Sequence, residues 1–487
     1  MRILVRIWKE YFTSLPKYYL LIIVATCLAG CKSGVQKSKL IPADRKPNIV
    51  FILIDDMGTA QLGCYGSKYY QTINIDHLAE SGLRFTDAYS VAAVCSPTRA
   101  GLMTGKYPAR LHITDFIPGN PGIGYPLKEP DWQKFLPLEE ITIGEIMQSN
   151  GYQTALFGKW HLSKDRVPPG SLEQNPDKQG FNEIFITHKP SPSLPLGSWQ
   201  TAEKDAHNVD TLTSRAIDFI ERNKNRLFFL IISHNSIHDP LMESSDLISK
   251  YKNLPVADDP ASNPVIGAMV EILDKSVGRI IEKIEDAGLL GNTLIVFYSD
   301  NGGKHSYAAQ TPFRTGKGWL YEGGIRVPLI ISWQGIIQPG TVSNQMVSSI
   351  DFFDTFLDVA GIHDTLQNRD GISFFNLLTD QSYFIDRQTL YWNYPHYHEG
   401  SGMRPACAIR DGNYKLIQWH EETLLKKEGA LELYDLEKDP GENNNLVKEY
   451  PEKAAELLDK LEKWKMETRA QEPVINNNYL DSSKISE

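Results

Sequence analysis

Three nearly unbroken apolar runs constrain the fold of this 487-residue chain more than any other feature. They span residues 48–54, 227–232 and 294–298, and each is followed at once by polar side chains. A strand that is apolar on both faces is typical of a parallel sheet covered by helices. Amphipathic helical patterns lie between the runs, at 73–81, 142–150, 211–223 and 265–287. The alternation predicts a doubly wound, mostly parallel α/β sheet flanked by helices.

The pattern changes after a predicted helix at 351–361 that ends in glycine. Short strand candidates follow at 389–392, 406–409, 414–417 and 433–436. An apolar stripe then predicts a closing helix, formed by Leu457, Leu458, Leu461 and Trp464. We therefore expect a larger N-terminal α/β domain at 47–375, a smaller antiparallel α+β domain at 376–475 and a tail at 476–487.

Composition excludes several classes of protein. The chain has 50 Lys plus Arg against 60 Asp plus Glu, a net charge of −10, and no basic run, so no nucleic-acid partner is expected. Its 5 cysteines are too few and too scattered for a disulfide framework. The spacing leaves open whether Cys64 and Cys407 form a disulfide bond.

The amino terminus has the pattern of an export signal. Residues 1–17 carry 4 Lys or Arg side chains, and 18–30 are uncharged with an apolar centre. Residues 28–31, Leu-Ala-Gly-Cys, resemble a bacterial lipobox, which predicts lipidation of Cys31, a membrane lipid anchor, a tether at 32–46 and a cell-envelope location in the periplasm or outer membrane. An ordinary cleavage site and a retained membrane helix are the alternatives.

Two of the apolar runs end in candidate metal ligands. Asp55 and Asp56 follow the first run, and Asp300 and Asn301 follow the third closely. Ligands of such sheets bind beyond the carboxyl ends of the strands, and these oxygen donors suit Ca²⁺ or Mg²⁺. The alternative is that the acidic pairs only cap helices.

Cys95 is predicted to begin a helix, because Pro97 suits a first helical turn. The helix dipole and Arg99 would then favour an anion and lower the pKa of the thiol. An isolated cysteine is otherwise a small buried residue.

The segment Cys95-x-Pro97-x-Arg99, with Ala-Gly-Leu-Met-Thr-Gly-Lys-Tyr after it, resembles the signature of type I sulfatases. These are formylglycine-dependent enzymes of the alkaline phosphatase superfamily, and the likeness is strongest to bacterial, arylsulfatase A-like glycan sulfatases. Further motifs occur in the family's order, at 47–50, 55–56, 158–161, 299–302 and 316–324. The resemblance covers about residues 46–450 and implies a sulfuric ester hydrolase.

By this resemblance, Cys95 is a precursor. A formylglycine-generating enzyme would oxidise it to formylglycine, whose hydrated gem-diol is the family's nucleophile. Asp55, Asp56, Asp300 and Asn301, together with the modified Cys95, would bind Ca²⁺, in preference to Mg²⁺.

The resemblance also implies roles for the basic residues. Lys159 and Lys317 would bind the sulfate, and Arg99 would support the diol. His161, two residues after Lys159, would partner the diol and help to expel sulfate. His238 would act as general acid for the leaving alcohol.

His234 is the rival of His238 for that last role. Pro240 preserves the family's His-x-Pro spacing, which favours His238.

The segments 110–119 and 390–398 resemble those of bacterial glycan sulfatases, which implies a sulfated glycan as substrate. The leading expectation is a 4-O-sulfate of galactose or N-acetylgalactosamine. His112, His396 and Arg404 are candidate sugar contacts, with surface or inter-domain packing as the alternative. Endo or exo action depends on the loops 119–134 and 190–200.

Two other functions stay open from the sequence. One is a phosphomonoesterase or phosphodiesterase of the same superfamily, although such enzymes usually have Ser or Thr at the nucleophile and paired zinc ligands. The other is a catalytically inactive, lipid-anchored glycan-binding protein.

Overall fold

The computed structural model describes residues 46–120, 124–164, 173–188, 199–201, 205, 207–363 and 368–479. All of them belong to the second of the two units into which the chain divides, Met1–Leu40 and Ile41–Glu487. The predicted signal, lipobox and most of the tether lie outside the described residues, as do 121–123, 189–198 and 480–487. No helix in the described part of the chain is long and apolar enough to cross a membrane.

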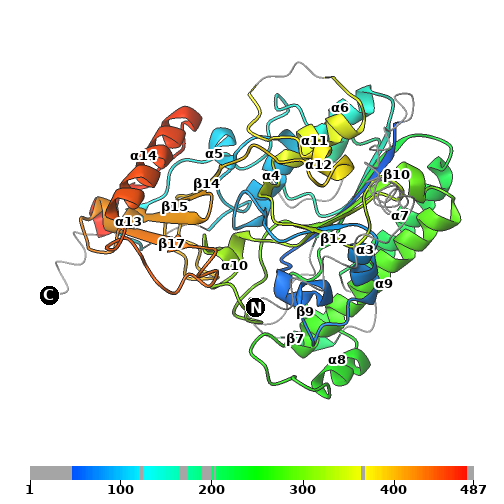
Figure 1. Cartoon of the computed structure of the whole chain (residues 1–487), viewed down its shortest axis with the longest axis horizontal. Coiled ribbons are helices and arrows are strands. Elements are labelled where there is room, and N and C mark those ends of the chain that lie inside the picture. The colour runs from blue at the N-terminus through cyan, green and yellow to red at the C-terminus, as the bar shows by residue number, and fades with distance from the viewer. Residues whose placement is uncertain are drawn as a thin grey trace, which may run out of the picture. The chain divides into compact units, whose positions relative to one another are not determined.

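An eight-stranded sheet forms the centre of the molecule, in the order β12-β2-β11-β10-β1-β8-β5-β6 (Figure 1). In that order the strands are Thr341–Ser343, Leu83–Phe85, Leu329–Ser332, Thr293–Ser299, Asn48–Ile54, Phe228–Ser233, Gln153–Gly158 and Glu183–Ile186. The five strands from β10 to β6 run parallel, whereas β11 is antiparallel to both of its neighbours. The prediction of a mostly parallel sheet is confirmed. The sheet is mixed, because β11 runs against its two neighbours.

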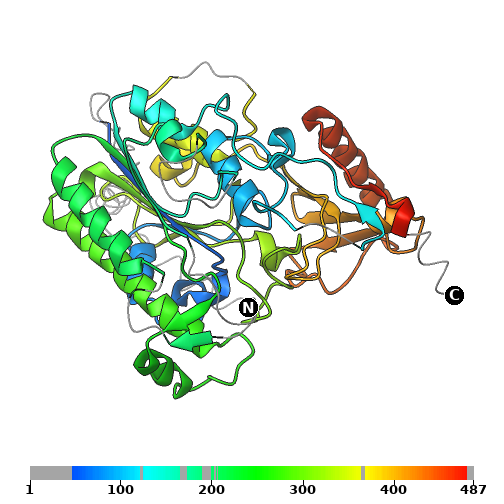
Figure 2. The same cartoon turned by 180° about the vertical axis from the view of Figure 1, so that it is seen from behind.

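Strand β1 shows why the sheet must be covered on both faces. Ile49, Phe51 and Leu53 pack into one hydrophobic cluster, while the alternating residues Val50 and Ile52 pack into another. Helices α4 (Cys95–Thr104), α6 (Ile143–Ser149), α11 (Asp351–Val359) and α12 (Phe375–Thr379) contribute to the first cluster. Helices α3 (Ile73–Glu80), α7 (Val209–Asn223), α8 (Ser245–Lys252) and α9 (Pro264–Asp286) contribute to the second, and Figure 2 shows the two long helices among them side by side.

Side-chain caps mark the start of α6 and of α9. The side chain of Thr142 accepts a hydrogen bond from the amide of Glu145, whose carboxylate accepts one from the amide of Thr142. The carbonyl oxygen of the Asn263 side chain caps α9, and Pro264 occupies the first turn. Such caps satisfy amides that have no partner within the helix.

The second sheet is antiparallel, in the order β14-β15-β16-β17, and lies beyond the main sheet (Figure 1). Its strands are Thr389–Tyr394, Ala406–Asp411, Tyr414–Trp419 and Leu431–Asp435. Helix α14 (Pro451–Thr468) packs Leu457, Leu461 and Trp464 against one face, so the predicted stripe is core. The other face packs Trp392 and Trp419 against residues that precede α4 and follow β10. The boundary at 375/376 stays a prediction, because the described residues form one compact unit.

Short elements complete the fold. The helices are α5 (Pro108–Leu111), α10 (Glu322–Ile325) and α13 (His420–Leu424), with 3₁₀ turns at Thr59–Gln61, Gly63–Tyr65, Pro176–Lys178 and Leu290–Asn292. Three strand pairs lie outside the large sheets: β3 (Ala88–Tyr89) with β13 (Val347–Ser348), β4 (Leu127–Lys128) with β18 (Val474–Ile475), and β7 (Trp199–Thr201) with β9 (Leu241–Glu243).

The structure answers the question of a disulfide bond. Cys64 and Cys407 are both free thiols, and the buried Cys407 donates to the side-chain oxygen of Gln418 at 3.1 Å.

A buried histidine in the second sheet region makes stability depend on pH. Burial, assisted by Lys465, lowers the pKa of His420 to about 3, whereas the unfolded chain takes up this proton near pH 6.5. The contribution of the neutral, buried His420 to the free energy of unfolding is therefore complete above about pH 6.5 and is lost as the pH falls toward 3. We expect His420→Gln to reduce the pH slope of the free energy of unfolding by about 1 kcal/mol per pH unit between about pH 5 and about pH 6.5.

Urea titrations of the wild type and variant at several pH values measure this slope. His77→Gln is the matched control, since the His77 side chain is 69% exposed and should leave the slope unchanged. Identical slopes for wild type and His420→Gln would contradict the prediction.

Candidate active site

The carboxyl ends of adjacent parallel strands bring the predicted acidic residues together. β1 and β10 pair in register up to Ile54 and Ser299, so the residues that follow are neighbours. The Asp56 amide donates to the Asp300 carboxylate at 3.3 Å, and the Asn301 amide group donates to Asp56 at 2.8 Å. The sequence prediction of one oxygen-rich cluster from two distant segments agrees with this geometry.

Helix α4 delivers a cysteine to this cluster. Cys95 is its first residue, as predicted, and Val94 before it is extended. The Cys95 sulfur lies 3.3 Å from Asp55 Oδ1 and 3.9 Å from Asp56 Oδ1. Every residue of α4 is buried, so the surrounding core holds the start of the helix in place.

Two lysines balance the carboxylates. Lys159 Nζ lies 2.7 Å from Asp55, and Lys317 Nζ lies 2.7 Å from Asp56 and 3.6 Å from the Cys95 sulfur. Lys159 follows β5, and Lys317 lies in a loop after β10, so different elements supply the two charges. Their side chains are only 11% and 10% exposed, so both ammonium groups face the cluster rather than bulk solvent.

Arg99 ties the helix to the strand ends. Its guanidinium donates to Asp300 at 2.9 Å, to the Lys159 carbonyl at 2.8 Å and to the Ser233 hydroxyl at 2.7 Å. Ser233 in turn donates to the Lys159 carbonyl at 2.7 Å. From the sequence, Ser233 is only a residue that ends a strand, and the pairing of β8 with β5 places it beside Lys159.

The structure separates the two rival histidines. His238 Nε2 lies 3.6 Å from Asp56, and its Nδ1 lies 2.7 Å from the Asp239 carbonyl. His234 is fully buried, its Nε2 lies 3.4 Å from Ser276, and burial lowers its pKa to about 4. Of the two, His238 faces the cluster and His234 belongs to the core.

His161 lies two residues after Lys159, in a left-handed conformation with φ 63°. Its Nε2 lies 2.7 Å from the Ile117 carbonyl oxygen, so this nitrogen donates the hydrogen bond. In the neutral ring, Nδ1 is then the proton acceptor. The role that the resemblance implies for His161 stays a prediction.

Burial sets the protonation behaviour of Cys95. Removal from water, together with the Asp300 and Asp55 carboxylates, raises the pKa of its thiol well above the ordinary value. The sequence expectation of a lowered pKa is wrong, because burial and two carboxylates outweigh the helix end and the cations. Burial alone would raise the pKa of Asp55 too, but Lys159 and His238 hold it well below its usual value.

The cluster fits a hard metal ion. Ligand atoms of Asp55, Asp56, Cys95 and His238 all lie within 4.8 Å of one another. The side-chain oxygen of Asn301 is buried without a hydrogen-bond partner, and such an acceptor is what a cation satisfies. Carboxylate and amide oxygens suit Ca²⁺ or Mg²⁺ better than zinc.

Each of the three candidate sugar contacts has a partner within the protein, although only His396 is buried. His112 Nε2 lies 3.1 Å from the Arg469 carbonyl, and Arg404 pairs with Glu422. His396 is fully buried, with Thr114 at 2.8 Å on one ring nitrogen and Glu129 at 2.8 Å on the other. These are the packing contacts of the alternative hypothesis, and a contact with sugar stays a prediction for each.

His398 is a residue that the sequence analysis missed. It is 7% exposed and lies against Gly318, where a Cβ atom would come within 2.6 Å of His398 Nδ1. Burial and the charges of Lys317 and Lys304 lower the pKa of His398 to about 4. The His-rich segment 396–398 marks this region in the sequence, but its pattern does not show which histidine faces the loop that carries Lys317.

An anion site with two lysines, beside a residue at a helix start and a set of metal ligands, is the arrangement of a hydrolase of sulfate or phosphate esters. Sequence comparison defines the family. The profile of the Sulfatase family matches residues 47–362, and the profile of the N-sulphoglucosamine sulphohydrolase C-terminal region matches 314–471. The chain belongs to the sulfatase family, with an alkaline phosphatase-like fold, and is a sulfuric ester hydrolase.

Individual relatives cover most of the chain. Arylsulfatase A of Homo sapiens is 32% identical over 83% of this chain and 84% of its own length. N-acetylgalactosamine-6-O-sulfatase of Bacteroides thetaiotaomicron is 27% identical over 90% of this chain and 96% of its own. The crystal structure of Ps i-CgsB in complex with k-i-k-neocarrahexaose has a TM-score of 0.70 and 27% identity, covering 86% of this chain and 93% of that one.

Metal binding can be tested apart from activity. We expect Asp56→Asn to weaken binding of Ca²⁺ by about 100-fold or more, because it removes a charged ligand from the centre of the cluster. Isothermal titration calorimetry of the purified, unconverted protein measures the affinity. Asp210→Asn, an exposed carboxylate paired with Arg279, is the control that should bind as the wild type does. Equal affinities for all three proteins would contradict the assignment.

Proposed function

We propose that this sulfatase removes O-sulfate groups from a sulfated carbohydrate, with residue 95 acting after its conversion to formylglycine. The observation that carries the proposal is the position of Cys95. Its sulfur lies at the start of α4 and within 4 Å of Asp55, Asp56 and Lys317. A nucleophile at this position would attack the sulfur atom of a sulfate group whose oxygens are bound by Lys159 and Lys317.

Asp55, Asp56, Asp300 and Asn301 would hold Ca²⁺ together with residue 95. When bound, the metal would polarise the sulfate, and the hydrated formylglycine would supply the attacking oxygen.

The lysines prepare the anion site. Lys159 and Lys317 have the Asp55 and Asp56 carboxylates as partners at 2.7 Å. Sulfate oxygens are acceptors of the same kind, so the two ammonium groups can bind them in place of part of these contacts. Arg99 keeps Asp300 and the start of α4 in a fixed arrangement, so that the site needs little rearrangement during the reaction.

His238 would transfer a proton to the leaving oxygen. Its Nδ1 donates to the Asp239 carbonyl and its Nε2 faces the cluster, so the doubly protonated imidazolium would donate its Nε2 proton to the leaving oxygen and would itself become the neutral ring. His161 has the complementary tautomer, with Nδ1 as acceptor, and would take a proton from the nucleophile.

The proposed substrate is a sulfated hexose, in the first place a 4-O-sulfate of galactose or N-acetylgalactosamine. One relative is named as a 6-O-sulfatase of N-acetylgalactosamine, which supports the sugar and leaves the position to experiment. Release of sulfate from a panel of 4-O- and 6-O-sulfated galactose and N-acetylgalactosamine, as monosaccharides and oligomers, decides both position and endo or exo action. A 6-O-sulfate hydrolysed alone would contradict the 4-O proposal.

The proposed location is the bacterial cell envelope. The apolar segment 18–30 followed by Cys31 supports export and lipidation, and a diacylated cysteine would hold the protein on a membrane surface. A formylglycine-generating enzyme is the required partner in maturation.

The two alternative functions are less well supported. Cysteine at position 95 disfavours a phosphoesterase, and the intact set of lysines and candidate metal ligands disfavours an inactive binding protein.

Conversion of Cys95 is the first prediction of this proposal. In protein co-produced with a formylglycine-generating enzyme, we expect the peptide carrying Cys95 to be about 18 Da lighter, the difference between CH₂SH and CHO. Peptide mass spectrometry measures it, and the peptide with Cys407 is the internal control that should keep its thiol mass. An unchanged Cys95 peptide, when a control sulfatase is converted in the same cells, would contradict the proposed chemistry.

The two lysines give the second prediction. We expect Lys159→Ala and Lys317→Ala each to lower kcat/KM for an aryl sulfate by about 10²–10³, the usual loss for one preorganised oxyanion contact. Steady-state sulfate release measures this, with the fraction of formylglycine determined for each variant. Lys438→Ala, whose side chain is 79% exposed, is the control. Wild-type rates for both site variants would rule out the assigned sulfate site.

A further inference from the structure

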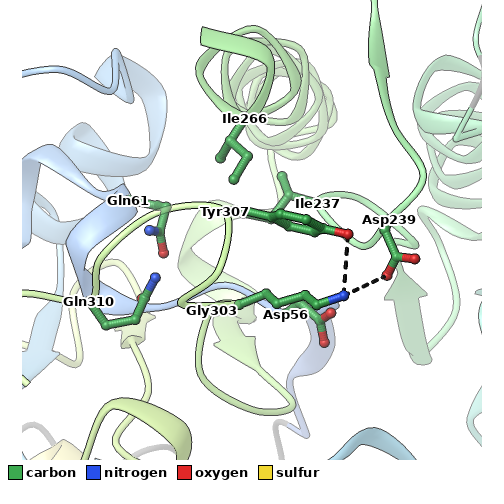
Figure 3. A pocket seen from close by; sticks show the side chains of 9 residues that line it. Asp56, Gln61, Ile237, Asp239, Ile266, Gly303, Tyr307 and Gln310 are labelled. Atoms are coloured by element: carbon green, nitrogen blue, oxygen red, sulfur yellow. Dashed lines mark hydrogen bonds and ion pairs between the residues drawn. The ribbon is translucent and has the colours of Figure 1, made fainter. Parts of the chain in front are cut away.

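A narrow pocket lined by both polar and apolar residues opens beside the proposed general acid (Figure 3). Asp56, Asp239, Lys304 and Tyr307 are among the polar residues that line it. The pocket has room for little more than a water-sized group, so it can take a small substituent but not a ring. Sulfate binding and proton transfer, as described above, make no use of Lys304 or Tyr307.

Lys304 is the centre of the pocket's polar groups. Its ammonium lies 3.2 Å from the Tyr307 hydroxyl and 4.5 Å from the centre of the same ring. It lies 4.0 Å from the Asp239 carboxylate, too far for a direct hydrogen bond and wide enough for an oxygen atom to bridge the two groups. In Figure 3, dashed lines join the Tyr307 hydroxyl and the Asp239 carboxylate to the same nitrogen, the Lys304 ammonium. The Lys304 and Asp239 side chains are 17% and 11% exposed, so each keeps access to the pocket.

The pocket lies on the side of the leaving group. Asp239 Oδ1 is 3.0 Å from His238 Nδ1, and His238 Nε2 faces Asp56 at 3.6 Å. The pocket therefore adjoins the His238 and Asp56 side of the cluster, whereas Lys159 contacts the other carboxylate, Asp55.

We propose that Lys304, Asp239 and Tyr307 bind a hydroxyl group of the sugar next to the sulfate ester, and so select carbohydrate over other leaving groups. This inference rests on the proposed function. A hydroxyl both accepts and donates, so it can accept from the Lys304 ammonium and donate to the Asp239 carboxylate at the same time. An anionic group could accept from Lys304 but could not donate to Asp239, and an apolar group could make neither of these hydrogen bonds.

The test compares two leaving groups in one enzyme. The substrates are 4-nitrophenyl sulfate, which has no hydroxyl, and the sulfated hexose of the panel that the converted wild type hydrolyses fastest. We expect Lys304→Met to lower kcat/KM for the sugar by about 10–100-fold, mainly through KM, and to change kcat/KM for the aryl sulfate less than about 2-fold. Lys304→Arg should recover part of the loss, which a merely misfolded variant would not allow.

Two controls make the comparison specific. Lys453, on α14, also lies over a tyrosine ring, that of Tyr414. Lys453→Met should leave kcat/KM for both substrates unchanged. A deoxy analogue of the hexose, lacking the neighbouring hydroxyl, should be a poorer substrate for the wild type but not for Lys304→Met, because the two changes remove the same contact.

The outcomes are distinct. Equal losses on both substrates, or no loss on the sugar, would overturn the inference and leave the sulfatase proposal standing. Failure of the converted wild type to release sulfate from either substrate would overturn the proposed function and this inference with it.

Discussion

The balance of buried charge at the strand ends is the constraint on which the rest of the structure depends. Asp55, Asp56 and Asp300 are almost fully buried, and each buried ion costs several kcal/mol unless it is compensated. Each carboxylate has a cationic partner within 3 Å, supplied by Lys159, Lys317 or Arg99. The carboxylate side chains that could bind a metal follow directly from the strands of the central sheet, and the same contacts that stabilise the fold therefore arrange the site.

The second sheet extends this constraint to the lysine loop. Glu322 follows Lys317 by five residues and accepts hydrogen bonds from Tyr89, in the strand that leads toward α4, and from Lys415 of β16. Glu442 also pairs with Lys415, at 2.8 Å, and accepts from the Glu322 amide at 2.6 Å. These groups are buried and share one another's hydrogen bonds, so the antiparallel sheet helps to hold the loop that carries Lys317.

Local patterns were enough to predict much of this protein. The packing of β1 into two clusters follows directly from its unbroken apolar run, and Thr142 caps the start of α6 because its partner Glu145 lies three residues later. The thiol pKa of Cys95 was predicted in the wrong direction, because the sequence shows the helix start but not the depth of burial. His398 was missed for a related reason: its contact with Gly318 joins segments about 80 residues apart.

The sequence by itself determined the order of the elements, the covered parallel centre of the sheet, the start of α4 at Cys95 and the chemical types at each strand end. These features depend on residues within a few positions of one another, so periodicity, capping and motif spacing encode them. Only the tertiary structure decided which charge faces which. The pairing of Lys159 with Asp55, the separation of His238 from His234 and the position of Lys304 beside Asp239 arise where the sheet brings distant segments together. Such contacts depend on strand order and burial, which no local pattern specifies.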